Sequence, residues 1–96
     1  SFETKDGYYN GNVLNVYYVP AANYTYGDYI NTAGFTNITS QFTYSTGTAS
    51  GYAANFTPSG NYQFPSSVTG NGYIVFEYSG SKTVTSTIQI DNIVVN

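Results

Sequence analysis

The sequence predicts an all-β fold, a sandwich or barrel of short strands, and three observations support this prediction. Residues that favour helices are nearly absent at helical spacing, because almost every window contains β-branched, aromatic, Gly or Asn residues. Several short segments alternate apolar and polar side chains, as half-buried strands do. Turn-forming pairs such as Asp6-Gly7 and Asn10-Gly11 separate these segments.

The first two strands are predicted at residues 2–5 and 13–19. Polar and apolar side chains already alternate from Ser1 onward. In the second segment Leu14, Val16 and Tyr18 are spaced two residues apart, so they share one face of a strand. Both segments therefore have the alternation typical of β-strands.

Two long connections follow. The first joins the second strand to predicted strands at residues 35–39 and 41–44, and the next joins these to residues 73–78. Connections of this length in a small domain are typically functional or wrapped over the core.

The last two strands are predicted at residues 73–78 and 84–95. Both faces of the first of these segments are largely apolar, so we expect both faces to be covered. Asn92 interrupts the alternation of the final segment, which predicts a bulge or a bend at that point.

The composition excludes several kinds of chemistry. The 96 residues, enough for one small domain, include no Cys and no His, which excludes disulfides, thiolate or imidazole metal ligands and catalysis by either residue. With two basic residues and a net charge of −3, little is available to neutralise phosphate, so we expect no nucleic-acid partner. No apolar run is long enough to cross a bilayer, so we expect no direct membrane insertion.

A paired-acid hydrolase needs two carboxylates that face each other across the substrate, and the positions of the five carboxylates in the sequence do not require such a pair. Asp6 and Asp28 fall in predicted loops and could approach one another, but nothing in the spacing requires it, and turn-forming or N–H-accepting aspartates are the favoured explanation of both positions. We therefore expect a protein that is not an enzyme.

Aromatic residues make up 19% of the chain and charged residues only 7%, and twelve residues are tyrosines. Aromatic faces with nearby amide and carboxylate groups favour the binding of neutral carbohydrate. The candidate ligand-binding residues lie in two predicted loops and are Tyr8, Tyr9, Asn10, Asn23, Tyr24, Tyr26, Asp28 and Tyr29. The alternative is that tyrosines pack within the fold, which we expect for Tyr18, Tyr44, Tyr73 and Tyr78 on the strands.

Six stretches together resemble a known family. They are Phe2-Glu3-Thr4-Lys5-Asp6-Gly7-Tyr8, Asn10-Gly11 with Val13-Leu14, Val16 and the Asn23-Tyr24 loop, Phe35-Thr36-Asn37-Ile38, Thr57-Pro58-Ser59-Gly60, Tyr73-Ile74-Val75-Phe76-Glu77-Tyr78-Ser79-Gly80-Ser81 and Thr87-Ile88-Gln89-Ile90-Asp91-Asn92-Ile93-Val94-Val95. In this order they resemble the choice-of-anchor J type module of secreted and surface proteins of Bacteroidetes.

The resemblance implies a jelly-roll-like antiparallel β-sandwich similar to carbohydrate-binding modules. It also implies an extracellular or outer cell surface location in a bacterium, with a signal or anchor upstream. Residues 1–96 would then form a single β-sandwich domain that is the C-terminal part of a longer module. Other members of the family carry further N-terminal strands. An edge strand left unpaired here would invite self-association with a second copy.

Two further expectations follow from a jelly-roll-like fold. Glu3 and Asp91 are acids near the first and last strands, where such modules often hold a structural calcium; alternatively, Asp91 accepts backbone N–H bonds at a bulge. We expect no other cofactor.

The rival to carbohydrate binding is a structural spacer or adhesion module without a small-molecule ligand.

Overall fold

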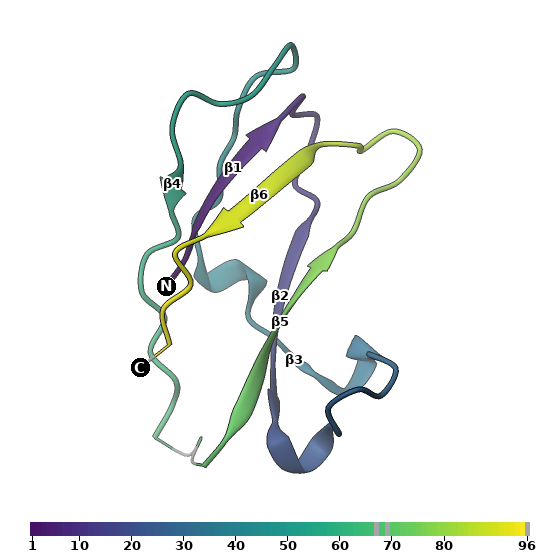
Figure 1. Cartoon of the computed structure of the whole chain (residues 1–96), viewed down its shortest axis with the longest axis vertical. Helices are drawn as coiled ribbons and strands as arrows, with labels where there is room; N and C mark the ends of the chain where they lie inside the picture. Colours follow the sequence, from purple (N-terminus) through teal and green to yellow (C-terminus); the bar gives the residue numbers. More distant parts are fainter. Residues whose placement is uncertain (67, 69, 96) are drawn as a thin grey trace.

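Two three-stranded antiparallel sheets face each other in the computed structural model, which describes residues 1–66, 68 and 70–95 (Figure 1). In one sheet β1 (Glu3–Gly7) lies between β4 (Thr57–Pro58) and β6 (Thr87–Asp91). In the other sheet β2 (Leu14–Pro20) lies between β3 (Thr36–Asn37) and β5 (Gly72–Tyr78).

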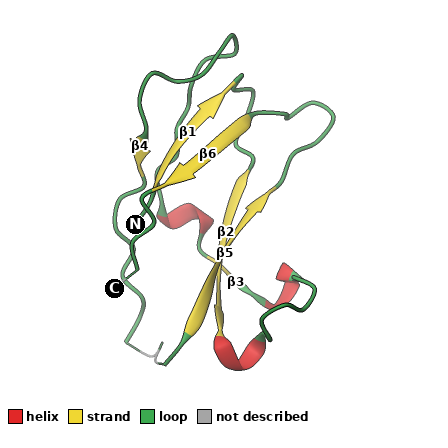
Figure 2. Cartoon of the chain, in the orientation of Figure 1, coloured by secondary structure: helices red, strands yellow, loops and turns green. Residues whose placement is uncertain are grey.

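The order of the strands confirms the predicted jelly-roll-like sandwich. The first strand pairs with the last and the second with the penultimate one, so the β2–β5 pair is nested within the β1–β6 pair. The helical segments of the described residues are three short 3-10 turns, η1 (Ala21–Asn23), η2 (Thr32–Gly34) and η3 (Thr39–Gln41) (Figure 2). None of the helices in this part of the chain could cross a bilayer.

The predicted strand at residues 41–44 is wrong. Thr39–Gln41 is a 3-10 turn, and the chain after it is held by single hydrogen bonds: Thr43 donates to the Ser59 carbonyl and Ser45 donates to the Thr4 hydroxyl. The Thr4 hydroxyl thus accepts a hydrogen bond that a backbone carbonyl would accept in a regular pair of strands. Alternation of polar and apolar residues does not reveal this substitution. The segment 35–39 shortens to β3 for a related reason, since its last residue begins this turn.

The core lies between the sheets and is small. Its buried members are Phe2, Leu14, Val16, Tyr18 and Ile38. Around them pack partly buried side chains: Phe42, Tyr44, Tyr62, Phe64, Val68, Ile74, Phe76, Ile88 and Ile90. Much of this packing is aromatic, because the ring of Phe2 lies 4.9 Å from that of Phe42 and 5.2 Å from that of Phe76.

The outer face of β2 and β5 is also covered, as the sequence predicts. Residues 21–35, here called the β2–β3 loop, fold back over it. Tyr24 packs its ring edge against Tyr73 at 5.4 Å, and Phe35 packs against Tyr17 at 6.5 Å. Glu77 on the same face accepts hydrogen bonds from Tyr17, Asn15 and Thr32.

The predicted interruption at Asn92 is a β-bulge. Glu3 pairs with Asp91, whereas Ser1 exchanges backbone hydrogen bonds with Val94, so the later strand contains one extra residue. Asn92 adopts a φ of 51°, and its amide donates to the Glu3 carboxylate at 2.7 Å. Asn tolerates this left-handed conformation better than most residues do.

Candidate functional site

The β2–β3 loop is anchored at both ends. At its start Ala21 donates to the Asn71 carbonyl, and near its end the Asn31 side chain accepts from Ala33 and caps η2. At its tip Asp28 donates to the Thr25 carbonyl, closing a turn in which Gly27 has a φ of 93°. Gly27, the third residue, has a positive φ and Tyr26, the second, does not, which indicates a type II turn and favours a residue such as glycine at the third position.

This turn projects tyrosines into solvent. Tyr26, the second residue of the turn, is 86% exposed, and Tyr29 just after it is 89% exposed. Tyr24 is different, because its ring is wedged between Tyr73 and Phe35 and its hydroxyl donates to the Asp28 carbonyl at 2.7 Å. Tyr24 therefore supports the turn that carries the two exposed rings.

A shallow pocket of about 340 Å³ opens beside the exposed rings. Its lining residues are Ala22, Asn23, Tyr24, Thr25, Asp28, Tyr29, Asn31 and Phe35. Four of the five residues predicted in this loop thus line one pocket. The fifth, Tyr26, lies in the turn between Thr25 and Asp28, which both line the pocket. Among the described residues, the side chains of Asn23 and Asp28 make no hydrogen bond, so their polar atoms are available to a ligand.

The other predicted loop lies at the opposite end of the sandwich. Tyr8, Tyr9 and Asn10 follow the end of β1, next to the start of β2, whereas the β2–β3 loop follows the end of β2 (Figure 1). The same placement separates Asp6 from Asp28, which the sequence allowed to approach one another.

Asn10 has a structural task. Its side-chain oxygen accepts from the Thr85 amide at 2.8 Å and from the Ser86 hydroxyl, and its amide donates to the Thr83 carbonyl and the Thr85 hydroxyl. Both the oxygen and the nitrogen of the Asn10 side chain are therefore used in hydrogen bonds to residues 83–86.

Tyr8 is half exposed and pairs with a ring that sequence reasoning missed. Its backbone adopts a φ of 50°, and its ring meets Tyr52 edge to face at 5.7 Å. Tyr52 also covers Gly7, where a Cβ atom would lie 2.5 Å from the Tyr52 ring. Tyr9 donates its backbone N–H to the Thr48 carbonyl. Tyr52 lies 44 residues after Tyr8, in a long connection, so no local pattern identifies the pair.

Asp6 is a buried acid that holds a loop. It is 2% exposed and accepts from the Ser45 hydroxyl and the Gly47 amide, both at 2.7 Å. Asp6 therefore accepts N–H and O–H bonds, but from residues 39 and 41 positions away rather than from its own turn.

Glu3 and Asp91, the predicted calcium ligands, are cross-strand partners on β1 and β6. One oxygen of each is already in use, since the Asn92 amide binds Glu3 and the Asn92 backbone N–H binds Asp91. Within the described residues no group of three or more acidic, His or Cys side chains surrounds a common point. Calcium usually takes six to eight oxygen ligands, and the ion stays a prediction here.

Comparison with known proteins identifies no relative of this chain. Neither a protein-family model, nor a curated protein, nor a solved structure matches the chain. The geometry of the β2–β3 loop and its pocket is therefore the basis on which a function can be assigned.

Proposed function

We propose that this protein is a non-catalytic carbohydrate-binding module and that the β2–β3 loop holds the sugar. The observation that carries the proposal is the exposure of Tyr26 and Tyr29, 86% and 89%, beside a pocket with free polar groups. Such exposed rings are apolar surface that a ligand can cover, and the C–H face of a sugar stacks on aromatic rings. Asn23 and Asp28 would then bind its hydroxyls.

Charge narrows the class of sugar. The chain has a net charge of −3, and no Lys lines the pocket. A sulfated or uronic-acid glycan would meet the Asp28 carboxylate without a compensating cation. We therefore assign a neutral saccharide, and a pocket of about 340 Å³ is large enough for a single sugar unit.

The resemblance to choice-of-anchor J modules supports the same class of function. It would place this chain in a secreted or surface-anchored bacterial protein, where a module without catalysis attaches its parent to a polysaccharide. The two-sheet antiparallel fold is compatible with that family.

The test is a neutral-glycan array, followed by titration of a bound oligosaccharide against Tyr26→Ala and Tyr29→Ala. Each loses one stacking ring, so we expect affinity to fall roughly tenfold per ring. Tyr8→Ala is the matched control, because it removes a half-exposed ring at the opposite end and should leave affinity unchanged.

Two results would contradict the proposal. If Tyr8→Ala weakens binding and Tyr29→Ala does not, the sugar binds at the other end of the sandwich. If no neutral glycan binds at all, the rival function, a spacer or adhesion module, is favoured instead.

A further inference from the structure

One side of β5 is a free sheet edge. β5 pairs with β2, and no other strand of the described residues pairs with it. Val16 of β2 donates its N–H to the Thr39 hydroxyl and accepts from the Ile38 N–H, so its backbone groups point away from β5. Its cross-strand partner Phe76 must therefore also point its N–H and C=O away from β2.

The same alternation applies along the whole strand. Ile74 and Tyr78, two residues on either side of Phe76, also direct their backbone groups to the free edge, and Gly72 follows the same pattern. No hydrogen bond to these groups occurs within the described part of the chain. The edge thus offers unpaired donors and acceptors over the length of β5.

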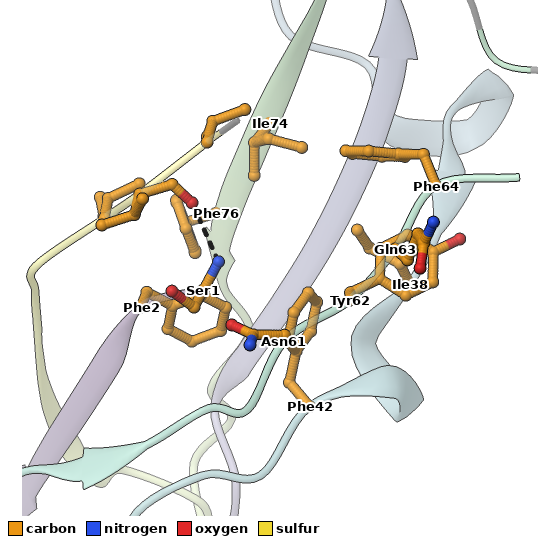
Figure 3. A pocket seen from close by; sticks show the side chains of 13 residues that line it. Ser1, Phe2, Ile38, Phe42, Asn61, Tyr62, Gln63, Phe64, Ile74 and Phe76 are labelled. Carbon is orange, nitrogen blue, oxygen red and sulfur yellow. Dashed lines mark hydrogen bonds between the residues drawn. The ribbon is translucent and has the colours of Figure 1, made fainter. Parts of the chain in front are cut away.

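A groove lined by apolar side chains together with the polar Asn61 and Gln63 adjoins this edge. The side chains of Ile74 and Phe76 point into a hollow of about 380 Å³ between the sheets, facing the aromatic rings of Phe2, Phe42 and Phe64 (Figure 3). None of the side chains that line the hollow is charged. A partner strand at the edge would therefore gain both backbone hydrogen bonds and cover for apolar side chains.

Unlike the other edges, that of β5 carries no protection. Natural edge strands are usually guarded by Lys, Pro, a bulge or short length. β3 and β4 have two residues each, β4 contains Pro58, and β6 runs into the bulge at Asn92. β5 has seven residues, and its single charge, Glu77, is bound on the outer face.

The chain as a whole exposes more surface than is usual for a monomer of its mass. The chain exposes 6246 Å². A folded monomer of 10.4 kDa exposes about 5,400 Å² by the usual scaling, which leaves an excess of about 850 Å². That excess is close to the roughly 800 Å² that each partner buries in a stable interface of standard size.

We infer that two copies of this chain associate through their β5 edges, about a twofold axis at Val75. In this register Gly72 lies opposite Tyr78 of the second copy, and Ile74 lies opposite Phe76 of the second copy. Every pair with edge-directed backbone groups is then hydrogen-bonded.

A second copy fits this edge for two reasons. β5 is complementary to itself in this register, since Glu77 faces Tyr73 of the second copy and no like charges lie opposite each other. The groove has no charged side chain in its lining, so it accepts the alternating apolar residues that β5 itself supplies. The inference is independent of any sugar bound at the β2–β3 loop.

The first experiment measures the dimer Kd of the full chain by sedimentation equilibrium over a concentration series. The same measurement is made on chemically synthesised chains in which one backbone amide is N-methylated. Methylation at Phe76 removes an edge-directed N–H without changing a side chain, so we expect the dimer Kd to rise at least about tenfold. The matched control is methylation at Ile90, whose amide faces the free edge of β6, because its partner Thr4 directs its backbone to β4. This control should dimerise as the unmodified chain does.

The second experiment uses the absence of cysteine from the chain. Val75→Cys would place two thiols opposite each other at the twofold axis, within disulfide range, and should cross-link rapidly under mild oxidation. Gln89→Cys, exposed on β6, should cross-link slowly. The inference is overturned if the unmodified chain stays monomeric up to about 1 mM. It is also overturned if Phe76 methylation leaves the Kd unchanged, or if both cysteine variants cross-link at the same rate.

Discussion

Asn10 shows how a chain with few charges fixes its loops. Its amide makes hydrogen bonds to the segment 83–86, including two with backbone groups of Thr83 and Thr85. Asp6 has the same task for the segment 45–47. In both cases a polar side chain that looked like a binding residue or a turn former joins segments that are distant in sequence.

Asn10→Ala should lower the free energy of unfolding by about 1–2 kcal/mol, because it breaks several partly exposed hydrogen bonds at once. Urea unfolding measures this change. Asn55→Ala is the control, since Asn55 is exposed, and we expect a change below about 0.5 kcal/mol. Equal effects of the two substitutions would show that the Asn10 bonds contribute nothing to stability.

Tyr44 makes stability depend on pH in the alkaline range. Burial raises the pKa of Tyr44 from 10.0 to about 12. Between these values the unfolded chain loses the phenol proton while the folded chain keeps it. The stabilising contribution is therefore complete below pH 10 and is lost as the pH rises towards 12.

Tyr44→Phe should flatten the decline of stability between pH 10 and 12, measured by urea unfolding at several pH values. The variant also loses the hydrogen bond to the Thr39 carbonyl, so its stability at neutral pH should be slightly lower. Tyr8→Phe serves as the control at a half-exposed ring. A slope for Tyr44→Phe identical to that of the unmodified chain would contradict the assignment.

At the scale of elements, the bulge after β6 depends on one residue. Asn92 has a φ of 51° and inserts the extra residue that shifts the pairing with β1. A β-branched residue is strongly disfavoured in this conformation, whereas glycine adopts it freely.

Asn92→Val should therefore destabilise the fold by about 2 kcal/mol, and Asn92→Gly by less than about 1 kcal/mol. The glycine variant still loses the bond from the Asn92 amide to Glu3. Comparing the two variants by urea unfolding isolates the backbone strain. If valine is no worse than glycine, the left-handed conformation is not what fixes the bulge.

The sequence predicts the elements that have regular alternation and misses those that depend on distant partners. β2 alternates in burial, β5 is a short run of largely apolar residues bounded by turn signals, and the interruption at Asn92 is visible because it breaks the period. β4, with two residues including Pro58, has no local pattern, and it exists because β1 provides its partner.

The candidate site also has one part that local sequence predicts and one part that depends on distant residues. The exposure of Tyr26 and Tyr29 follows from a glycine turn in a long loop, which local sequence indicates. The support of Tyr24 by Tyr73 depends on the fold of the loop over β5, 49 residues later, and no local pattern reveals it.

At the scale of the whole molecule, dimerisation and sugar binding would reinforce each other. In the inferred register even-numbered residues of β5 pair with even-numbered residues, so the outer faces of both copies lie on the same side of the joined sheet. The β2–β3 loop packs on that outer face. A dimer would therefore present two sugar sites to one surface.

This arrangement predicts avidity for an immobilised neutral polysaccharide. The chain should bind such a surface at least about tenfold more tightly than a free oligosaccharide of the same sugar, because the second site then binds at high effective concentration. N-methylation at Phe76 should abolish this gain and leave the oligosaccharide Kd unchanged, whereas Tyr29→Ala should weaken both. Surface plasmon resonance and calorimetry measure the two affinities. If Phe76 methylation leaves the surface affinity intact, the two sites do not act together; if it weakens the oligosaccharide as well, the sugar site itself depends on the β5 edge.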